Sequence, residues 1–118
     1  MRFMGGWTLL HFAICKNDIV AADLLLKFGL DVNSTTDEMH RTALHEAALG
    51  NKIEIVEFLI GWGSDPNICD SDRNTAMHFA VDYGYLEVVK ALLASSTSVD
   101  LNIRNNTNMN PFNTCRNS

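Results

Sequence analysis

Thr42-Ala43-Leu44-His45-Glu46-Ala47-Ala48 is the stretch that decides the fold, because related stretches recur on both sides of it at a nearly constant distance. The copies begin at Thr8, at Thr75 and, in a weaker form, at Asn110. These anchors are 34, 33 and 35 residues apart, and a fixed period of this length is typical of proteins built from stacked repeats. The sequence therefore predicts one structural unit of about 33 residues, repeated along the chain.

Within each unit the pattern predicts two short helices followed by a polar loop. A threonine precedes each first helix as an N-cap, Asp18 caps one second helix, and Gly29 and Gly63 end two of them. The polar segments after the second helices favour projecting hairpins. The expected helices cover residues 8–15, 18–28, 42–49, 52–61, 75–82 and 85–94, and the expected hairpins cover residues 34–41, 68–74 and 103–109.

Apolar residues at helical spacing predict the buried side of each second helix. We expect these faces to contain Ile19, Ala22, Leu25, Leu26, Ile53, Val56, Leu59, Ile60, Leu86, Val89, Leu92 and Leu93. Glu54 and Glu57 are expected to face water. A single helix pair is too small to bury its apolar side alone, so the units should stack into an all-α solenoid with one continuous core.

Size and charge exclude several classes of protein. The 118 residues are 47% hydrophobic, which suits one soluble domain, and no apolar stretch reaches membrane-spanning length. A net charge of −5 without a basic run argues against nucleic acid and anionic membranes as partners. Three cysteines without a CxxC pair indicate free thiols in a reducing, intracellular compartment. Residues 2–15 resemble a short signal peptide, but the register of residues 8–13 with the repeat favours a structural role.

The repeated pattern resembles that of the ankyrin-repeat family, over nearly the whole chain from Gly6 to Cys115. That family opens each repeat with Thr-Pro-Leu-His-x-Ala-Ala and closes it with Gly-Ala-Asp-x-Asn. The resemblance implies antiparallel helix pairs, β-hairpin loops that project at right angles, and a concave protein-binding surface. It also implies a single domain, residues 1–118, with repeats at about 5–37, 38–71 and 72–106 and a partial repeat at 107–118. In the second unit the matching residues are Thr42, Leu44, His45, Ala47, Ala48, Ile55, Val56, Leu59, Gly63, Asp65 and Asn67.

Departures from the family pattern are also informative. The proline that starts the first helix is absent from the three full units. The hairpin glycine is replaced by His40, Arg73 and Asn108. A positive φ at His40 or Arg73 would cost on the order of 1 kcal/mol each. No polar capping helix precedes Thr8, which predicts either a segment of a longer array or self-association through uncapped ends.

Three histidines, His11, His45 and His78, occupy the same place in successive units and suggest a metal site at first sight. Zinc needs three or four converging ligands, whereas stacked helices would hold these roughly 10 Å apart. We therefore expect each histidine to make a hydrogen bond between neighbouring units. No catalytic arrangement, phosphate-binding glycine loop or metal motif is recognisable, so neither an enzyme nor a cofactor or metal ion is predicted.

The function that remains is recognition of another protein, through the first-helix face and the hairpin tips; the alternative is a structural spacer within a longer array or multidomain protein. Aromatic side chains ringed by carboxylates suit a partner segment with apolar and basic groups. The expected contact residues are Trp7, Phe12, Lys16, Glu38, Met39, His40, Arg41, Glu46, Leu49, Asp70, Asp72, Arg73, Asn74, Phe79, Asp82 and Tyr83.

Asn33 is a candidate for hydroxylation. In some ankyrin-repeat proteins this modification falls on an asparagine that follows Asp-Val, with a leucine eight residues upstream. Leu25, Asp31 and Val32 resemble that arrangement around Asn33. The ordinary role of such an asparagine, a hydrogen bond that holds the turn, is compatible with modification.

Overall fold

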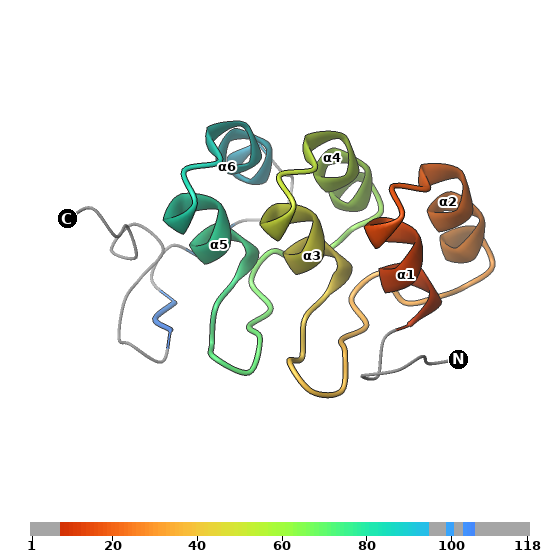
Figure 1. Ribbon diagram of the computed structural model, residues 1–118, viewed down its shortest axis with the longest axis horizontal. Helices are drawn as coiled ribbons and strands as arrows, with labels where there is room; N and C mark the ends of the chain where they lie inside the picture. The colour runs from red at the N-terminus through yellow and green to blue at the C-terminus, as the bar shows by residue number, and fades with distance from the viewer. Residues whose placement is uncertain (1–7, 95–98, 101–102, 106–118) are drawn as a thin grey trace.

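Three helix pairs stand in a row in the computed structural model, which describes residues 8–94, 99–100 and 103–105 (Figure 1). Each pair consists of two antiparallel helices joined by a short turn, and a longer loop leads to the next pair. The predicted partial repeat at residues 107–118 lies outside the described residues. The six helices are α1 (Leu9–Cys15), α2 (Ile19–Lys27), α3 (Ala43–Leu49), α4 (Ile53–Gly61), α5 (Ala76–Asp82) and α6 (Leu86–Leu93).

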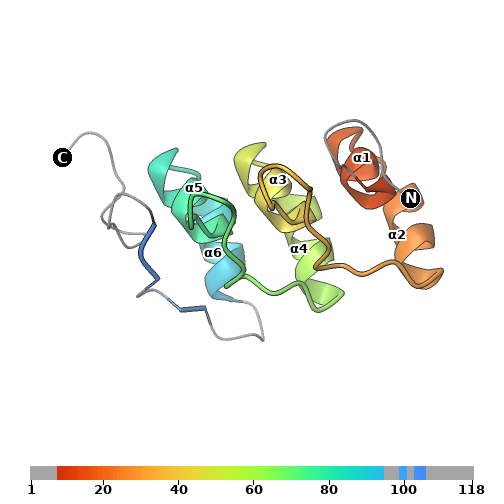
Figure 2. The same cartoon turned by 90° about the horizontal axis from the view of Figure 1, so that it is seen from below.

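The helices form two layers. The first helices α1, α3 and α5 lie side by side in one layer, and the second helices α2, α4 and α6 lie in the other (Figures 1 and 2). α1 packs against α3 and α3 against α5, while each first helix also packs against the second helix of its own pair. This arrangement confirms the predicted all-α solenoid. Within the described residues, no helix has the length and apolar character needed to cross a membrane.

The threonine that opens each repeated stretch caps the first helix, as predicted. The hydroxyl oxygens of Thr42 and Thr75 accept hydrogen bonds from the backbone N–H groups of His45 and His78, at 3.2 and 3.3 Å. Asp18 caps α2 in the same way, through the N–H of Ala21 at 3.1 Å. Each cap satisfies a backbone donor that the first turn of a helix otherwise leaves without a partner.

Positive φ angles mark the ends of the helices. Gly29 (φ 109°) and Gly63 (φ 86°) end α2 and α4, which confirms their predicted role. The turns inside the three helix pairs use Asn17, Asn51 and Gly84 with φ between 54° and 71°. Asparagine and glycine tolerate this left-handed region better than other residues do, so short turns between antiparallel helices form at low cost.

The core runs continuously through the stack. Small residues of the first helices, such as Ala47 and Ala80, allow close packing, and apolar residues of the second helices fill the remaining space. In α4 and α6 the fully buried residues include Val56, Leu59, Val88 and Leu92. Glu54 and Glu57 face water, as predicted.

Two of the predicted core residues are wrong. Leu86 is 69% exposed at the first position of α6, and Leu93 is 51% exposed at its last position. Val88, which was not predicted, is buried in their place. The error arises because a second helix here is covered both by its own first helix and by the neighbouring pair, so its buried side is not a single helical stripe.

Long loops project from the helices on one side of the stack (Figure 1). Backbone bonds close each of the two described loops: the Thr36 N–H donates to the Arg41 carbonyl at 3.0 Å, and the Asp70 N–H donates to the Asn74 carbonyl at 2.9 Å. The loops also contact each other, since the Ser71 N–H donates to the Met39 carbonyl at 2.8 Å. The two loops therefore project together as a continuation of the stack.

Side-chain amides link consecutive repeats near the end of each second helix. The Asn33 Oδ1 atom accepts a hydrogen bond from the backbone N–H of Asp65 at 2.8 Å. One repeat later, the Asn67 Oδ1 atom accepts from the N–H of Asp100 at 2.7 Å. The Asn33 side chain thus links its repeat to the next one, whereas the prediction was a hydrogen bond that holds its own turn. Its hydroxylation stays a prediction.

Candidate functional site

The three first helices present one row of side chains at equivalent positions. Phe12, Glu46 and Phe79 each lie four residues after the capping threonine of their unit, so the stack places them side by side. Phe12 is 46% exposed, and the side chains of Glu46 and Phe79 are half-buried. This row, here called the first-helix row, places a carboxyl group between two aromatic rings.

Arg41 lies at the centre of this region and touches Phe79. Its guanidinium carbon is 5.2 Å from the centroid of the Phe79 ring, a cation–π distance. Its Nε atom is 3.6 Å from the Asp70 Oδ2 atom, too long for a hydrogen bond but close enough for strong attraction between the charges. Asp70 and Phe79 together therefore hold the Arg41 side chain against α5.

Asp70 is not exposed at the tip of its loop, where the sequence analysis expected it; its contact with a partner stays a prediction. Only 4% of its surface is exposed. Its Oδ1 atom accepts hydrogen bonds from the backbone N–H groups of Asp72 and Asn74, both at 2.9 Å. An aspartate that binds the backbone of its own turn stabilises that turn, and here it also positions Arg41.

The histidines connect neighbouring repeats. The Nε2 atom of His11 lies 2.7 Å from the Arg41 carbonyl oxygen, and the Nε2 atom of His45 lies 2.9 Å from the Asn74 carbonyl oxygen. The Nδ1 atom of His45 accepts from the Thr42 N–H at 3.0 Å, so the proton is on Nε2, which donates to Asn74. The predicted hydrogen bond between units is thus confirmed for His11 and His45.

Burial changes the acidity of two groups in this region. His45 is almost completely buried, and this lowers the pKa of its imidazole below the usual range because the charged form loses its hydration. Burial raises the pKa of the Glu46 carboxyl, and the positive charges of Arg41 and Lys52 offset part of that rise. In the part of the chain that the structure describes, no group of three or more His, Cys, Asp or Glu residues is placed to bind a metal ion.

Exposed aromatic groups lie at both ends of the first-helix row. At one end, the Lys16 Nζ atom lies 5.5 Å from the centroid of the Phe12 ring. At the other end, Tyr83 follows α5, is 50% exposed, and stacks on Tyr85 with ring centroids 5.6 Å apart. Leu49 and Asp82 also lie half-buried at the ends of their first helices.

The loop tips carry the remaining predicted contact residues. Glu38, His40, Asp72 and Arg73 are exposed there, and Met39 is half-buried. His40 (φ 54°) and Arg73 (φ 63°) adopt the left-handed conformation predicted for the positions of the missing glycines. Trp7 lies outside the described residues, so its expected role stays a prediction.

Lys52 and the outer side of α2 were not predicted from the sequence. The Lys52 Nζ atom donates to the Ile14 carbonyl at 2.9 Å and so joins the first two helix pairs at the end of α1. In the sequence Lys52 stands at the N-terminus of α4, so nothing there indicated its contact with the end of α1. Val20 lies on the outer side of α2 at the position that Glu54 and Glu87 occupy in the later units. A comparison of the three units at that position would have revealed it.

Comparison with known proteins agrees with this geometry. The family model described as ankyrin repeats (3 copies) matches residues 3–70, and the ankyrin repeat model matches residues 72–106. The chain belongs to the ankyrin-repeat family. Ankyrin repeats are generally protein–protein interaction modules.

Similar proteins occur in animals and viruses. An ankyrin repeat protein of Fowlpox virus (strain NVSL) is 31% identical over 80% of this chain, and human Rabankyrin-5 is 33% identical over 84%. The B-cell lymphoma 3 protein homolog of Mus musculus is 33% identical over 85% of the chain. The matched regions span only 14%, 9% and 23% of these relatives.

A solved structure shares the fold closely. The crystal structure of the ankyrin repeat domain of Bcl-3, a member of the IkappaB protein family, matches with a TM-score of 0.88 and 28% identity. The match covers 94% of this chain and 48% of the Bcl-3 domain.

Proposed function

We propose that this chain is a non-enzymatic module that binds a partner protein through the first-helix row and the loop tips. One observation carries the proposal: Phe12 and Tyr83 remain about half exposed at opposite ends of a surface that also holds the partly buried Glu46. Exposed aromatic side chains near rigidly held charges are the usual anchors of protein interfaces. The proposed contacts are Phe12, Lys16, Glu38, Met39, His40, Arg41, Glu46, Leu49, Asp72, Arg73, Asn74, Phe79, Asp82 and Tyr83.

The chemistry of this surface favours a partner segment with apolar side chains and a basic group. Phe12 and Tyr83 offer apolar area to the partner, whereas Arg41 is already held by Phe79 and Asp70. Glu38 and Asp72 place carboxylates at the exposed loop tips, where they can attract a lysine or arginine. The contact between Arg41 and Phe79 therefore fixes both side chains. The acidic loop tips favour a basic partner.

Further parts of the proposal rest on His45, on the cysteines and on the net charge. Both ring nitrogens of His45 are occupied by structural hydrogen bonds, so this histidine holds the stack together and is not available for acid–base catalysis. Cys15 and Cys69 are free thiols, which suits a reducing compartment, either cytoplasm or nucleus. The net charge of −5 supports a protein partner in preference to nucleic acid or membrane.

The test uses a Phe12→Ala, Tyr83→Ala double variant. A partner is first isolated by affinity purification on the wild-type chain, and its Kd is then measured for each variant. We expect the double variant to bind at least about tenfold more weakly, because exposed aromatic anchors contribute more than 1 kcal/mol each at interfaces.

The matched control is Trp62→Ala, which removes an exposed aromatic side chain from the end of α4 in the second-helix layer. This control should bind like the wild type. A double variant that keeps its helical circular dichroism and its wild-type Kd would overturn the proposed surface.

A further inference from the structure

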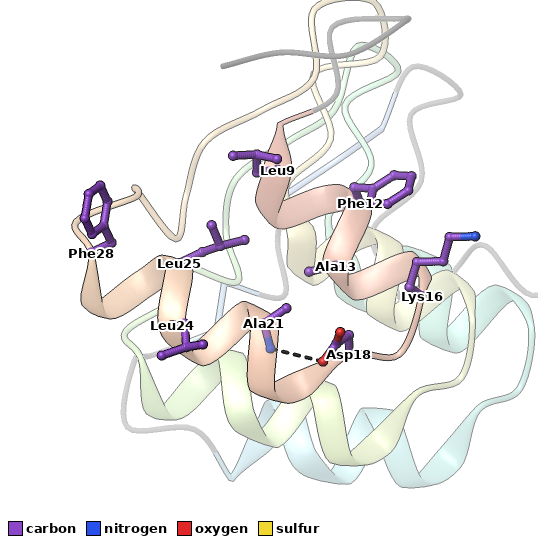
Figure 3. Close-up of a pocket in the computed structure, with 9 residues that line it drawn as sticks. All are labelled: Leu9, Phe12, Ala13, Lys16, Asp18, Ala21, Leu24, Leu25 and Phe28. Carbon is purple, nitrogen blue, oxygen red and sulfur yellow. Dashed lines mark hydrogen bonds between the residues drawn. The ribbon is translucent and has the colours of Figure 1, made fainter.

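Glu46 carries a half-buried carboxyl group in the middle of the first-helix row. The equivalent positions of the neighbouring helix pairs hold Phe12 and Phe79, so an acidic side chain stands between two aromatic ones. α1 and α5 both pack against α3, so the exposure of Glu46 does not depend on the ends of the chain (Figure 1). By contrast, the hollow of about 680 Å³ that Leu25 borders lies within the first pair, between α1 and α2 (Figure 3). The surroundings of Glu46 are thus defined by the described stack itself.

The Glu46 carboxylate has no direct partner within the part of the chain that the structure describes. No described residue donates a hydrogen bond to it or forms an ion pair with it. A carboxylate that is partly removed from water without a hydrogen-bond donor raises the free energy of the folded chain. Burial raises the pKa of Glu46 accordingly. A donor that arrives from outside would therefore stabilise this group.

Lys52 is the first of two cations near Glu46, but its charged end is directed elsewhere. Its Nζ atom donates to the Ile14 carbonyl at 2.9 Å, at the end of α1. Gly50 allows this contact, because a Cβ atom there would stand 3.0 Å from the Lys52 Cε atom. Lys52 thus joins two helix pairs and leaves the Glu46 carboxylate without an ammonium group in contact.

Arg41 is the second cation near Glu46, and Asp70 balances its charge. The Asp70 carboxylate is buried, and its Oδ2 atom is 3.6 Å from the Arg41 Nε atom. The guanidinium group also lies over the Phe79 ring. Both cations are therefore held by other groups, and the Glu46 carboxylate keeps its capacity to accept hydrogen bonds.

We propose that Glu46 binds a lysine or arginine side chain of the partner protein, between apolar partner residues that contact Phe12 and Phe79. This contact rests on the proposed function, since it requires the first-helix row to be the binding surface. Charge complementarity selects the basic side chain, because its charged end donates to the carboxylate while its aliphatic stem packs beside the rings. An acidic side chain would be repelled, and an apolar one would close the interface over a carboxylate without a donor.

Peptide selection tests the predicted charge preference. A random peptide library displayed on phage is selected on the wild-type chain, and we expect the bound peptides to share a lysine or arginine with apolar neighbours. Selection on Glu46→Lys should replace this basic residue by aspartate or glutamate, because the charge that it meets is reversed. Peptides that bind the first-helix row without a shared basic residue would overturn the contact.

Isothermal titration calorimetry with one selected peptide measures the strength of the contact. Glu46→Gln keeps the shape of the side chain but removes its charge, and should weaken binding at least about tenfold. Replacement of the basic peptide residue by glutamine should weaken binding to the wild type by a similar factor and should have little further effect on Glu46→Gln. Independent, multiplying losses would show that the two groups do not touch.

The matched control is Glu57→Gln, which removes the same charge from the exposed side of α4. This variant should bind the peptide like the wild type, and helical circular dichroism checks that each variant is folded. A folded Glu46→Gln variant with the wild-type Kd would overturn the Glu46 contact.

The Phe12→Ala, Tyr83→Ala double variant separates this contact from the proposed function. If the double variant loses the peptide but Glu46→Gln keeps it, the surface is correct and the Glu46 contact is wrong. If the double variant binds like the wild type, the proposed surface itself is wrong. A library that yields no peptide bound to the wild type counts against both.

Discussion

The first and second helix pairs share a pattern but differ in their surroundings. Leu25 of α2 and Leu59 of α4 occupy the same position in the repeat, yet Leu25 is half-buried beside a hollow and Leu59 has no exposed surface. The difference comes from the neighbouring helices, because α4 packs against both α3 and α6, whereas α2 packs mainly against α1. In a solenoid, burial is thus a property of the stack and not of the individual repeat.

The largest expected effect is the difference in stability loss between alanine variants of these two leucines. Leu59→Ala should lower the free energy of unfolding by about 2–5 kcal/mol, as large-to-small changes in a closed core do. Leu25→Ala should cost about 1 kcal/mol, because much of the space around it is already open. Urea denaturation followed by circular dichroism measures both. Equal losses for the two variants would contradict the difference in packing between the helix pairs.

The next largest expected effect is a pH dependence of stability caused by His45, in the middle helix pair. Burial lowers the pKa of His45 in the folded chain, so below about pH 6.5 the unfolded chain binds a proton that the folded chain does not. Stability should therefore fall as the pH decreases from 7 toward 5.5, by at most about 1.4 kcal/mol per pH unit for this group.

The variant His45→Gln isolates this contribution. Glutamine can still reach neighbouring backbone groups but does not titrate, so the variant should be less stable at pH 7 and should show a weaker dependence on pH. Urea denaturation at several pH values measures both properties. An unchanged pH slope in a folded variant would show that His45 is not the group responsible.

The smallest expected effect is the gain in stability when the strained residue at either described loop tip is replaced by glycine. Arg73→Gly should raise the free energy of unfolding by about 1 kcal/mol, because glycine adopts a positive φ without strain. The bond from the Arg73 Nε atom to the Arg104 carbonyl, at 3.2 Å, is lost in this variant and reduces the gain. His40→Gly tests the same strain at the other tip.

Thermal unfolding measures both glycine variants against the wild type. A raised midpoint in each would confirm that the two tips store similar strain. A lowered midpoint for Arg73→Gly would mean that the arginine side chain stabilises its loop more than its backbone conformation costs.

Much of the fold could be predicted because a repeat presents the same information several times. The spacing of Thr8, Thr42 and Thr75 predicted the stack, and the recurring histidines predicted hydrogen bonds between repeats. The positive φ angles of His40 and Arg73 were also predicted, because each replaces a glycine of the family pattern at a turn. Features that recur at the same position of each repeat can therefore be predicted from the sequence.

The errors have a common physical cause, since exposure depends on neighbours that the pattern of one repeat does not reveal. Asp70 is polar and lies in a turn, but its carboxylate binds its own loop backbone and faces Arg41. Leu86 and Leu93 have the spacing of core residues but lie at the two ends of α6. The sequence predicted which residues belong to the candidate contact surface. How they are arranged became clear only from the stacked helix pairs.

The hydrogen bonds between repeats have a consequence for how the chain folds. Those made by His45, Asn33 and Lys52 join residues 29, 32 and 38 positions apart. Each of these contacts therefore closes a loop of about one repeat, so the entropy lost on closure would be the same in a longer array of such units. A stack connected in this way has low contact order relative to its length, which favours rapid folding that starts in any helix pair and spreads to the next.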